Sequence, residues 1–267
     1  MFINTVLLFL QSAFPMFIII SLLLLRFTAT SESLVTNKNM AIMSVLAILL
    51  VLLLSQYMEK ISQLFDDKGT EFVFSFGSIV IYFCSAFLFL LDKKDRFIHV
   101  KKYLALAVFL LVFSIHGSHF ILYLTSYWTQ SSTFELSGFE SLFIGIILGV
   151  GICVSFAILL YFLLRYSDTH VHIKTSCYFL LFFAIGQLMQ SIVLLQQVDV
   201  LPLSYSVWNS TAFIAENSEF GQLLRVLFGY ETTPSFMQLI IYLTAFIVPV
   251  FISKTRYLVR LAYGEKS

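Results

Sequence analysis

The chain has 267 residues, of which 59% are apolar and 12% are charged, and its mean hydropathy is +0.92. Soluble domains carry about twice that share of charged residues, so the composition indicates a membrane protein. The net charge of +1 gives no overall field that would attract nucleic acid, so nucleic-acid binding is excluded. The three cysteines, Cys84, Cys153 and Cys177, form no Cys-x-x-Cys pair and imply neither a disulfide framework nor a thiolate metal site.

Seven long stretches without Asp, Glu, Lys or Arg follow one another along the chain. Each is long enough for a helix to cross the hydrocarbon core, which takes about 20 residues. We therefore expect an all-α, polytopic membrane protein with a single transmembrane domain, residues 1–267. Its seven helices are expected at about residues 3–26, 39–58, 72–91, 103–127, 141–164, 175–197 and 233–253. The uncharged run 200–215 is short and contains Pro202, Asn209, Ser210 and Thr211, so residues 198–232 are expected to form an outer loop.

The lysines and arginines predict the orientation, because they accumulate on the inner side of a membrane. With the N-terminus outside and the C-terminus inside, only Lys60, Lys68 and Arg225 lie outside. The first helix has no basic residue before Arg26, so we expect it to be retained and not cleaved as a signal peptide. The inner set is Arg26, Lys38, Lys93, Lys94, Arg96, Lys101, Lys102, Arg165, Lys174, Lys254, Arg256, Arg260 and Lys266.

The outer segments are rich in acidic residues, which would concentrate cations, although an ordinary solvated face explains them equally well. These residues are Glu59, Asp66, Asp67, Glu71, Glu135, Glu140, Asp199, Glu216, Glu219 and Glu231. The long outer loop also carries apolar residues that suggest a short helix lying against the mouth of the bundle. They are Phe213, Phe220, Leu223, Leu224 and Leu227.

Two histidines, His116 and His119, are the only ionisable acid, base or imidazole groups near the middle of a predicted membrane helix. An ionisable group there costs several kcal/mol, about 3 on insertion scales, and is a functional candidate by default. Their spacing of three residues puts both imidazoles on one helix face, where they could share a metal ion or a proton pathway. The alternative is that they only hydrogen-bond to neighbouring helices.

Two ligands are too few for a closed metal site, so neighbouring helices would have to contribute further groups. The candidates are Gln11, Ser12 and Met16 on the first helix, and Gln187, Met189 and Gln190 on the sixth. Pro15 frees the carbonyl of Gln11, which then either faces a polar cavity or belongs to a simple packing kink. The glycines of the fifth helix, Gly145, Gly149 and Gly151, favour close packing.

The chain resembles high-affinity iron permeases, the fungal and bacterial ferric permeases, over nearly its whole length. The specific part of the resemblance is about forty residues near the C-terminus, which match the last outer loop and the seventh helix of that family. The matching residues are Trp208-Asn209-Ser210, Glu216-Asn217-Ser218-x-x-Gly221-Gln222-Leu223-Leu224, Leu227-Phe228-Gly229-Tyr230, Pro234-Ser235-x-x-Gln238 and Tyr242. This resemblance implies two inverted copies of a three-helix unit followed by a seventh helix, with the site where the copies meet. It also implies a plasma (cytoplasmic) membrane location and an extracytoplasmic metal-donor or oxidase partner besides the lipid bilayer.

The family signature is Arg-Glu-Gly-Leu-Glu, present in the first and fourth helices, and its carboxylates are understood to carry the ferric ion. The first copy aligns here with residues 11–15 and the second with residues 115–119, and neither keeps a glutamate. The second copy keeps Gly117 and has His116 and His119 in the two glutamate positions. His116 and His119, which stand out because an ionisable group inside a membrane costs free energy, are therefore the two residues that align with the family's metal site.

Imidazole ligands favour ferrous iron, nickel, copper or zinc over ferric iron. Copper(I), with Met16 or Met189 as an additional ligand, is consistent with the histidine pair. Three functions remain open: a transition-metal permease that transports the ion and holds no tight cofactor, a non-transporting partner or assembly subunit, and a membrane haem protein. The haem function needs a second central histidine, whereas His99, His170 and His172 lie at the inner edge. The sequence contains no nucleophile–base pair or nucleotide motif, so we do not expect an enzyme.

Overall fold

The computed structural model describes residues 2–28, 37–91, 97–131, 137–170, 174–202, 204–215 and 218–262. Within these ranges the regular structure is helical, apart from one isolated bridge between Ser206 and Ser235. The helices are α1 (Phe2–Thr28), α2 (Asn37–Ser62), α3 (Gly69–Leu91), α4 (Ile98–Ser131), α5 (Ser137–His170), α6 (Thr175–Gln197), α7 (Glu219–Phe228) and α8 (Phe236–Ala262). The all-α class expected from the composition is confirmed.

Six of the described helices, α2 to α6 and α8, are long and apolar enough to cross a membrane. The chain is therefore a multi-pass membrane protein. Helix α1 is 27 residues long, and its shorter apolar stretch within the described side chains runs from Phe9 to Leu25. The helices extend beyond the uncharged windows because the polar residues at their ends continue the helical hydrogen bonding into the interface.

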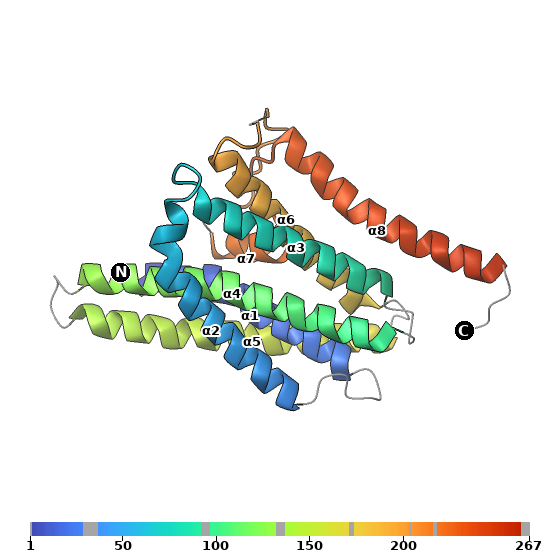
Figure 1. Ribbon diagram of the computed structural model, residues 1–267, viewed down its shortest axis with the longest axis horizontal. Coiled ribbons are helices and arrows are strands. Elements are labelled where there is room, and N and C mark those ends of the chain that lie inside the picture. The colour runs from blue at the N-terminus through green and yellow to red at the C-terminus, as the bar shows by residue number, and fades with distance from the viewer. Residues whose placement is uncertain are drawn as a thin grey trace.

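The helices form a layered bundle in which α3 and α6 lie over α4 and α1, while α8 contacts α3 and α6 and its C-terminal end projects beyond them (Figure 1). Serine hydroxyls join two of the closest helix pairs. Ser75 Oγ of α3 donates to the carbonyl of Ser191 of α6 at 3.2 Å, and Ser21 Oγ of α1 donates to the carbonyl of Ala157 of α5 at 3.0 Å. Lipid supplies no hydrophobic force between helices, so such packing and hydrogen bonds hold the bundle together.

The helix contacts follow a regular pattern. Helix α1 packs on α5 as α2 packs on α4, and α2 meets α3 as α5 meets α6. Helices α1 and α4 contact each other, as do α3 and α6, and the members of each pair run in opposite directions (Figure 1). An exchange of α1–α3 with α4–α6 therefore preserves these contacts.

Residues 198–232 are not simply an outer loop, because α7 enters the bundle and contacts α1 and α6. A Cβ built on Gly186, near the middle of α6, would lie 3.1 Å from the Gly229 nitrogen and 3.3 Å from the Val226 oxygen. The C-terminal end of α7 thus reaches the middle of a spanning helix. The backbone leaves the helical conformation at Gly229, and non-helical backbone is tolerated at the depth of the middle of a spanning helix only where protein surrounds it.

The short helix is present, but its buried residues differ from the expected set. Leu227 is buried and Leu223 packs against the main core. Phe220 is 59% exposed, and Phe213 lies outside α7 and is 90% exposed. The expectation for these two phenylalanines was wrong, because α7 presents its Leu223–Leu227 side to the bundle and turns Phe220 outward.

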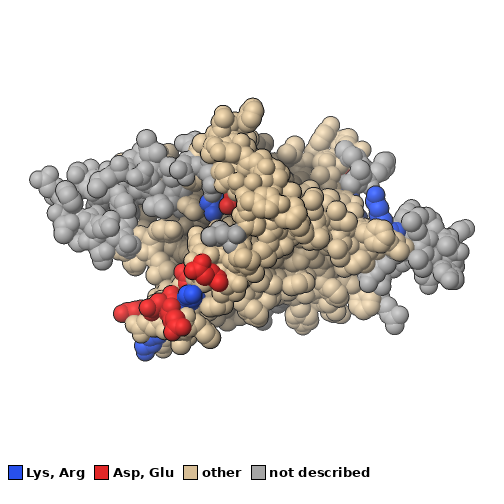
Figure 2. Space-filling view, turned by 90° about the horizontal axis from the view of Figure 1, so that it is seen from above, with Lys and Arg blue, Asp and Glu red and all other residues tan. Residues whose placement is uncertain are grey.

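The acidic side chains visible in Figure 2 gather mostly at the end of the molecule where α2 turns into α3, and the long middle of this face is uncharged. Asp66, Asp67 and Lys68 lie in that turn, Glu59 and Lys60 lie near the end of α2, and Glu71 lies at the start of α3. Lys68 Nζ donates to the carbonyl of Val198 at 2.9 Å, which places a cation at the C-terminal end of α6. Several charged residues that were assigned to one side of the membrane lie outside the described residues, among them Lys93, Lys94, Arg96, Lys266, Glu135 and Glu216. His172, which was considered for the haem function, also lies outside them.

Candidate functional site

His116 is buried in the middle of α4 and is 3% exposed. Its Nε2 lies 2.9 Å from Oε1 of Gln187, which comes from the middle of α6 and is also buried. Because an amide oxygen can only accept, Nε2–H is the donor, and Nδ1 keeps the lone pair that could bind a metal. In most metal-binding histidines one ring nitrogen binds the metal, and the other donates its N–H to a carbonyl or carboxylate oxygen.

His119 lies one turn further along α4 and is partly buried. Its ring is tilted by 31° against that of Phe74 of α3, with the centroids 4.0 Å apart. The two histidines therefore contact different neighbours, His116 touching α6 and His119 touching α3. Both remain at the meeting of α3, α4 and α6 in the interior of the bundle.

The turn of α4 that carries the histidines is tightly packed against two helices. A Cβ on Gly117 would lie 2.7 Å from Val51 of α2, and a Cβ on Gly77 of α3 would lie 2.5 Å from Ile115. Ser114 Oγ and Ser118 Oγ donate to carbonyls of α4 itself, at 2.7 and 2.8 Å. The hydroxyls of these serines bond within α4, and the hydrogen bond from this turn to α6 comes from His116.

The other predicted residues are only partly brought together with the pair. Gln11 and Gln190 are exposed, whereas Ser12 and Pro15 are buried and Met16 packs against the main core. No group of three or more His, Cys, Asp or Glu side chains that could hold a metal occurs among the described residues. A metal at His116 and His119 would therefore need amide, backbone or water ligands to complete its shell.

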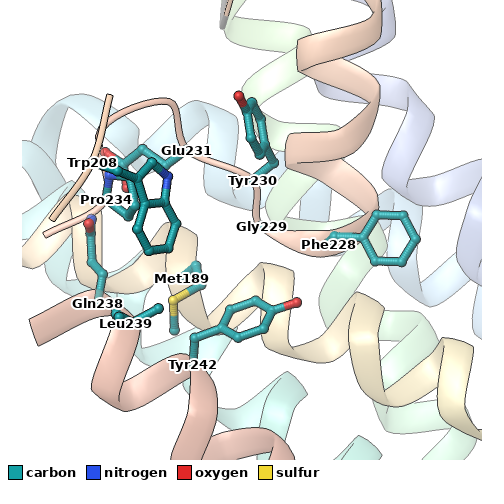
Figure 3. Close-up of a pocket in the computed structure, with 10 residues that line it drawn as sticks. All are labelled: Met189, Trp208, Phe228, Gly229, Tyr230, Glu231, Pro234, Gln238, Leu239 and Tyr242. Carbon is teal, nitrogen blue, oxygen red and sulfur yellow. The ribbon is translucent and has the colours of Figure 1, made fainter. Parts of the chain in front are cut away.

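Seven of the eighteen residues quoted for the C-terminal motif line one cavity of about 220 Å³ near the start of α8. Figure 3 shows this pocket, in which the indole of Trp208 extends towards Met189 and Tyr242 lies beyond Met189. Met189 faces this pocket, so it is not positioned as a ligand beside His116. Gly221 of the motif is not part of the lining; its backbone nitrogen donates to Ser218 Oγ at 3.0 Å and so caps α7. The lining residues are Met189, Trp208, Phe228, Gly229, Tyr230, Glu231, Pro234, Gln238, Leu239 and Tyr242.

A reciprocal cap and the hydrogen bonds of one tyrosine explain two further parts of the motif. Ser235 Oγ accepts from the Gln238 nitrogen at 3.3 Å, and Gln238 Oε1 accepts from the Ser235 nitrogen at 2.6 Å, which is a capping box at the start of α8. Ser210 Oγ and the Tyr230 hydroxyl are 2.8 Å apart, and the Tyr230 hydroxyl donates to the Ile214 carbonyl at 3.2 Å. These bonds fix the loop around Trp208 against the ends of α7 and α8.

The sequence missed two features of this region, because it assigned α7 to the outer loop. Arg225 lies in α7 one residue before Val226, whose carbonyl oxygen lies beside Gly186 in the middle of α6. Gly229 has a left-handed φ of 69° and lets the backbone of α7 approach Gly186 closely. The Phe-Gly-Tyr turn was the only signal of this approach.

Comparisons of this chain with protein-family models, with curated proteins and with solved structures gave no match.

Proposed function

We propose that this protein is a transition-metal ion permease in which His116 and His119 are transient ligands at the middle of the membrane. The observation that carries this proposal is the buried contact between His116 Nε2 and Gln187 Oε1 at 2.9 Å. This contact orients the imidazole of His116 so that its Nδ1 is available for a metal ion. The second imidazole, that of His119, lies one turn further along α4. The resemblance to iron permeases, whose signature aligns with the same two positions, supports the assignment.

The contact pattern of the helices supports an inverted three-plus-three repeat, followed by α8 as a further crossing. Helices α1–α3 and α4–α6 have equivalent partners, and an odd number of helices per copy inverts the second copy in the membrane. With α1 counted as a crossing, the protein spans the membrane seven times. The lysine and arginine distribution then favours an outer N-terminus and a plasma membrane orientation with the C-terminus inside.

The chemistry of the pair favours a borderline or soft ion such as ferrous iron, copper, zinc or nickel. The two histidine ligands are neutral and Gln187 beside them is uncharged, so they offer no counter-charge and the ion would cross with several neutral donors or with a low charge. Gln187 acts as a positioning residue, because it holds His116 in the tautomer that can bind metal. The acidic turn between α2 and α3 would raise the local concentration of cations outside.

A second candidate function is a non-transporting partner subunit of a metal-uptake system. It is favoured by the fact that the described residues bring together no group of three or more His, Cys, Asp or Glu. In that function the His116–Gln187 bond would serve only to join α4 to α6. An extracytoplasmic metal donor or oxidase would then be found with the protein when it is captured from membranes.

Metal analysis of the purified full-length protein tests the permease proposal. The protein is loaded in turn with iron, copper, zinc and nickel, and the bound metal is measured beside a His116→Ala/His119→Ala double variant. We expect one metal to be retained by the native protein and lost in the double variant. Uptake of that metal into proteoliposomes should fall to background in the same variant.

The matched control is His170→Ala, because His170 is exposed at the end of α5 and its ring stacks on Tyr166. This variant should retain metal and uptake, and the amount of each variant in the membrane is measured at the same time. Absence of metal from the native protein would contradict the permease proposal. Co-purification of a second protein, with no metal in either form, would favour the partner subunit.

A further inference from the structure

A second cavity, of about 310 Å³, lies between α1, α5 and α7. Its eight lining residues include no charged side chain, and Gln222 of α7 is the only polar one among them. The Oε1 atom of Gln222 is itself buried and, among the described residues, has no hydrogen-bond partner. Because this oxygen is covered by protein, a ligand in the cavity would meet a surface that is mainly hydrocarbon.

Two packed phenylalanines form the floor of this cavity. Phe14 of α1 is buried, and its ring meets that of Phe156 of α5 with the centroids 4.9 Å apart and an interplanar angle of 61°. A Cβ on Gly149 of α5 would lie 2.7 Å from the ring of Phe9, so α1 and α5 are in close contact there as well. The floor is therefore formed before any ligand binds, as it is in most small-molecule sites.

Two exposed side chains of the lining mark the open side of the cavity. Ile152 of α5 is 46% exposed, and Phe220 of α7 is 59% exposed. Ile152 lies near the middle of α5, a helix that is long and apolar enough to cross a membrane. At that depth the medium outside the protein is hydrocarbon and not water. The cavity therefore opens towards the acyl chains of the bilayer.

The volume of the cavity decides which hydrocarbon group it can hold. One turn of an α-helix, about 10 Å wide and 5.4 Å long, occupies about 400 Å³, which exceeds the volume of the cavity. A water-sized group occupies about 30 Å³ in a liquid, so the cavity accommodates a row of about ten methylene groups. A helix of a second copy is therefore too large, whereas a single acyl chain fits.

We propose that this cavity binds one acyl chain of a phospholipid, which stays attached to the protein. An empty apolar cavity forfeits van der Waals contacts at its lining, and a chain that fills it restores them. The lining has no charged side chain to hold a headgroup, so recognition falls to the chain. The open side at Ile152 and Phe220 lets the rest of the lipid remain in the bilayer.

This inference goes beyond the proposed metal transport and does not rest on it. His116, His119 and Gln187 are not among the lining residues of the cavity. His116 contacts α6 and His119 contacts α3, whereas the cavity is bounded by α1, α5 and α7. A failure of metal retention would therefore leave the lipid site unaffected, and the two proposals are tested separately.

Photo-crosslinking of the full-length protein tests the proposal. The protein is reconstituted with phosphatidylcholine that carries a diazirine at the end of one chain, washed in lipid-free detergent, and irradiated without added metal. We expect one phospholipid to be retained, as measured by phosphorus analysis, and its cross-links to fall on the cavity lining. Retention of no phospholipid, cross-links to a second copy, or equal labelling of Phe251, an exposed residue of α8, would overturn the proposal.

Substitutions at the open side provide the matched comparison. Ile152→Trp puts a larger ring into the cavity from an exposed position, and the amount of retained phospholipid should fall by about tenfold. Leu159→Trp enlarges an exposed residue of α5 outside the lining and should leave retention unchanged. Equal retention in the native and Ile152→Trp proteins would exclude the site.

A second variant keeps the test decisive if Ile152→Trp does not fold. Phe220→Ala removes an aromatic wall at an exposed position and should lower retention by about threefold or more. The melting temperature of each variant shows whether it is folded. Unchanged retention in a folded Phe220→Ala protein would by itself exclude the site.

Discussion

The hydroxyl of Tyr82 on α3 compensates for Pro249 on α8. Pro249 has no backbone N–H, so it leaves the carbonyl of Ala245, four residues earlier, without its helical donor. Tyr82 donates a hydrogen bond of 3.0 Å to this carbonyl oxygen, and both Tyr82 and Ala245 are buried. A proline inside a membrane helix is tolerated when a neighbouring helix satisfies the freed group in this way.

Tyr82→Phe should therefore destabilise the protein by about 1 kcal/mol, as expected for one interhelical hydrogen bond in a membrane. The measurement is thermal unfolding of the purified protein in detergent. The decisive comparison uses a Pro249→Ala background, in which the backbone donor of residue 249 is restored. There Tyr82→Phe should cost much less, and an equal loss in both backgrounds would show that the hydroxyl acts through some other contact.

The contact between Gly229 and Gly186 predicts a strong effect of a single methyl group. Gly229 has a φ of 69°, and a Cβ there would lie 3.0 Å from the Gly186 Cα and 3.0 Å from the Met189 Cγ. Gly229→Ala should cost about 1 to 2 kcal/mol from the left-handed backbone, and more from the clash. The melting temperature should fall by about 2 to 4 °C for each kcal/mol.

Gly151→Ala is the matched control for this change, because nothing lies within 4 Å of a Cβ at Gly151 of α5. Alanine stabilises a helix interior relative to glycine by about 0.5 to 1 kcal/mol, so this variant should be neutral or slightly more stable. If both glycine variants lowered the melting temperature equally, α7 would not be packed against α6 at this point.

The role of Gln187 as a positioning residue predicts a graded series of variants. Gln187→Leu removes the acceptor for His116 Nε2–H and should weaken metal retention by about 10- to 100-fold. Gln187→Glu keeps an acceptor oxygen and should retain most of the affinity. Gln190→Leu, three residues further along α6 and exposed, is the control and should have no effect. Equal loss in the leucine and glutamate variants would mean that Gln187 does not act as an acceptor.

The positions of the long helices could be predicted from the sequence because a spanning segment must avoid charge over its whole length. His116, His119 and Gln187 could be named for the related reason that polar groups are costly in lipid and need partners. The pairing of His116 with Gln187 could not be predicted, because Gln11 and Gln190 were equally plausible by composition. The structure separates them by burial, since Gln187 is 2% exposed whereas Gln11 and Gln190 are exposed.

The sequence by itself determined that this is an all-helical membrane protein and which turn of α4 carries ionisable groups, since both follow from the cost of charge in lipid. Only the tertiary structure decided how residues 198–232 are used. Their composition is that of an aqueous loop, yet α7 and Gly229 pack beside Gly186 in the middle of α6. That position depends on a close contact between two glycines, on the reciprocal caps of Ser235 and Gln238, and on the bonds of Tyr230. Contacts between residues distant in the chain are not encoded in local hydropathy, so they emerge only when the helices are packed.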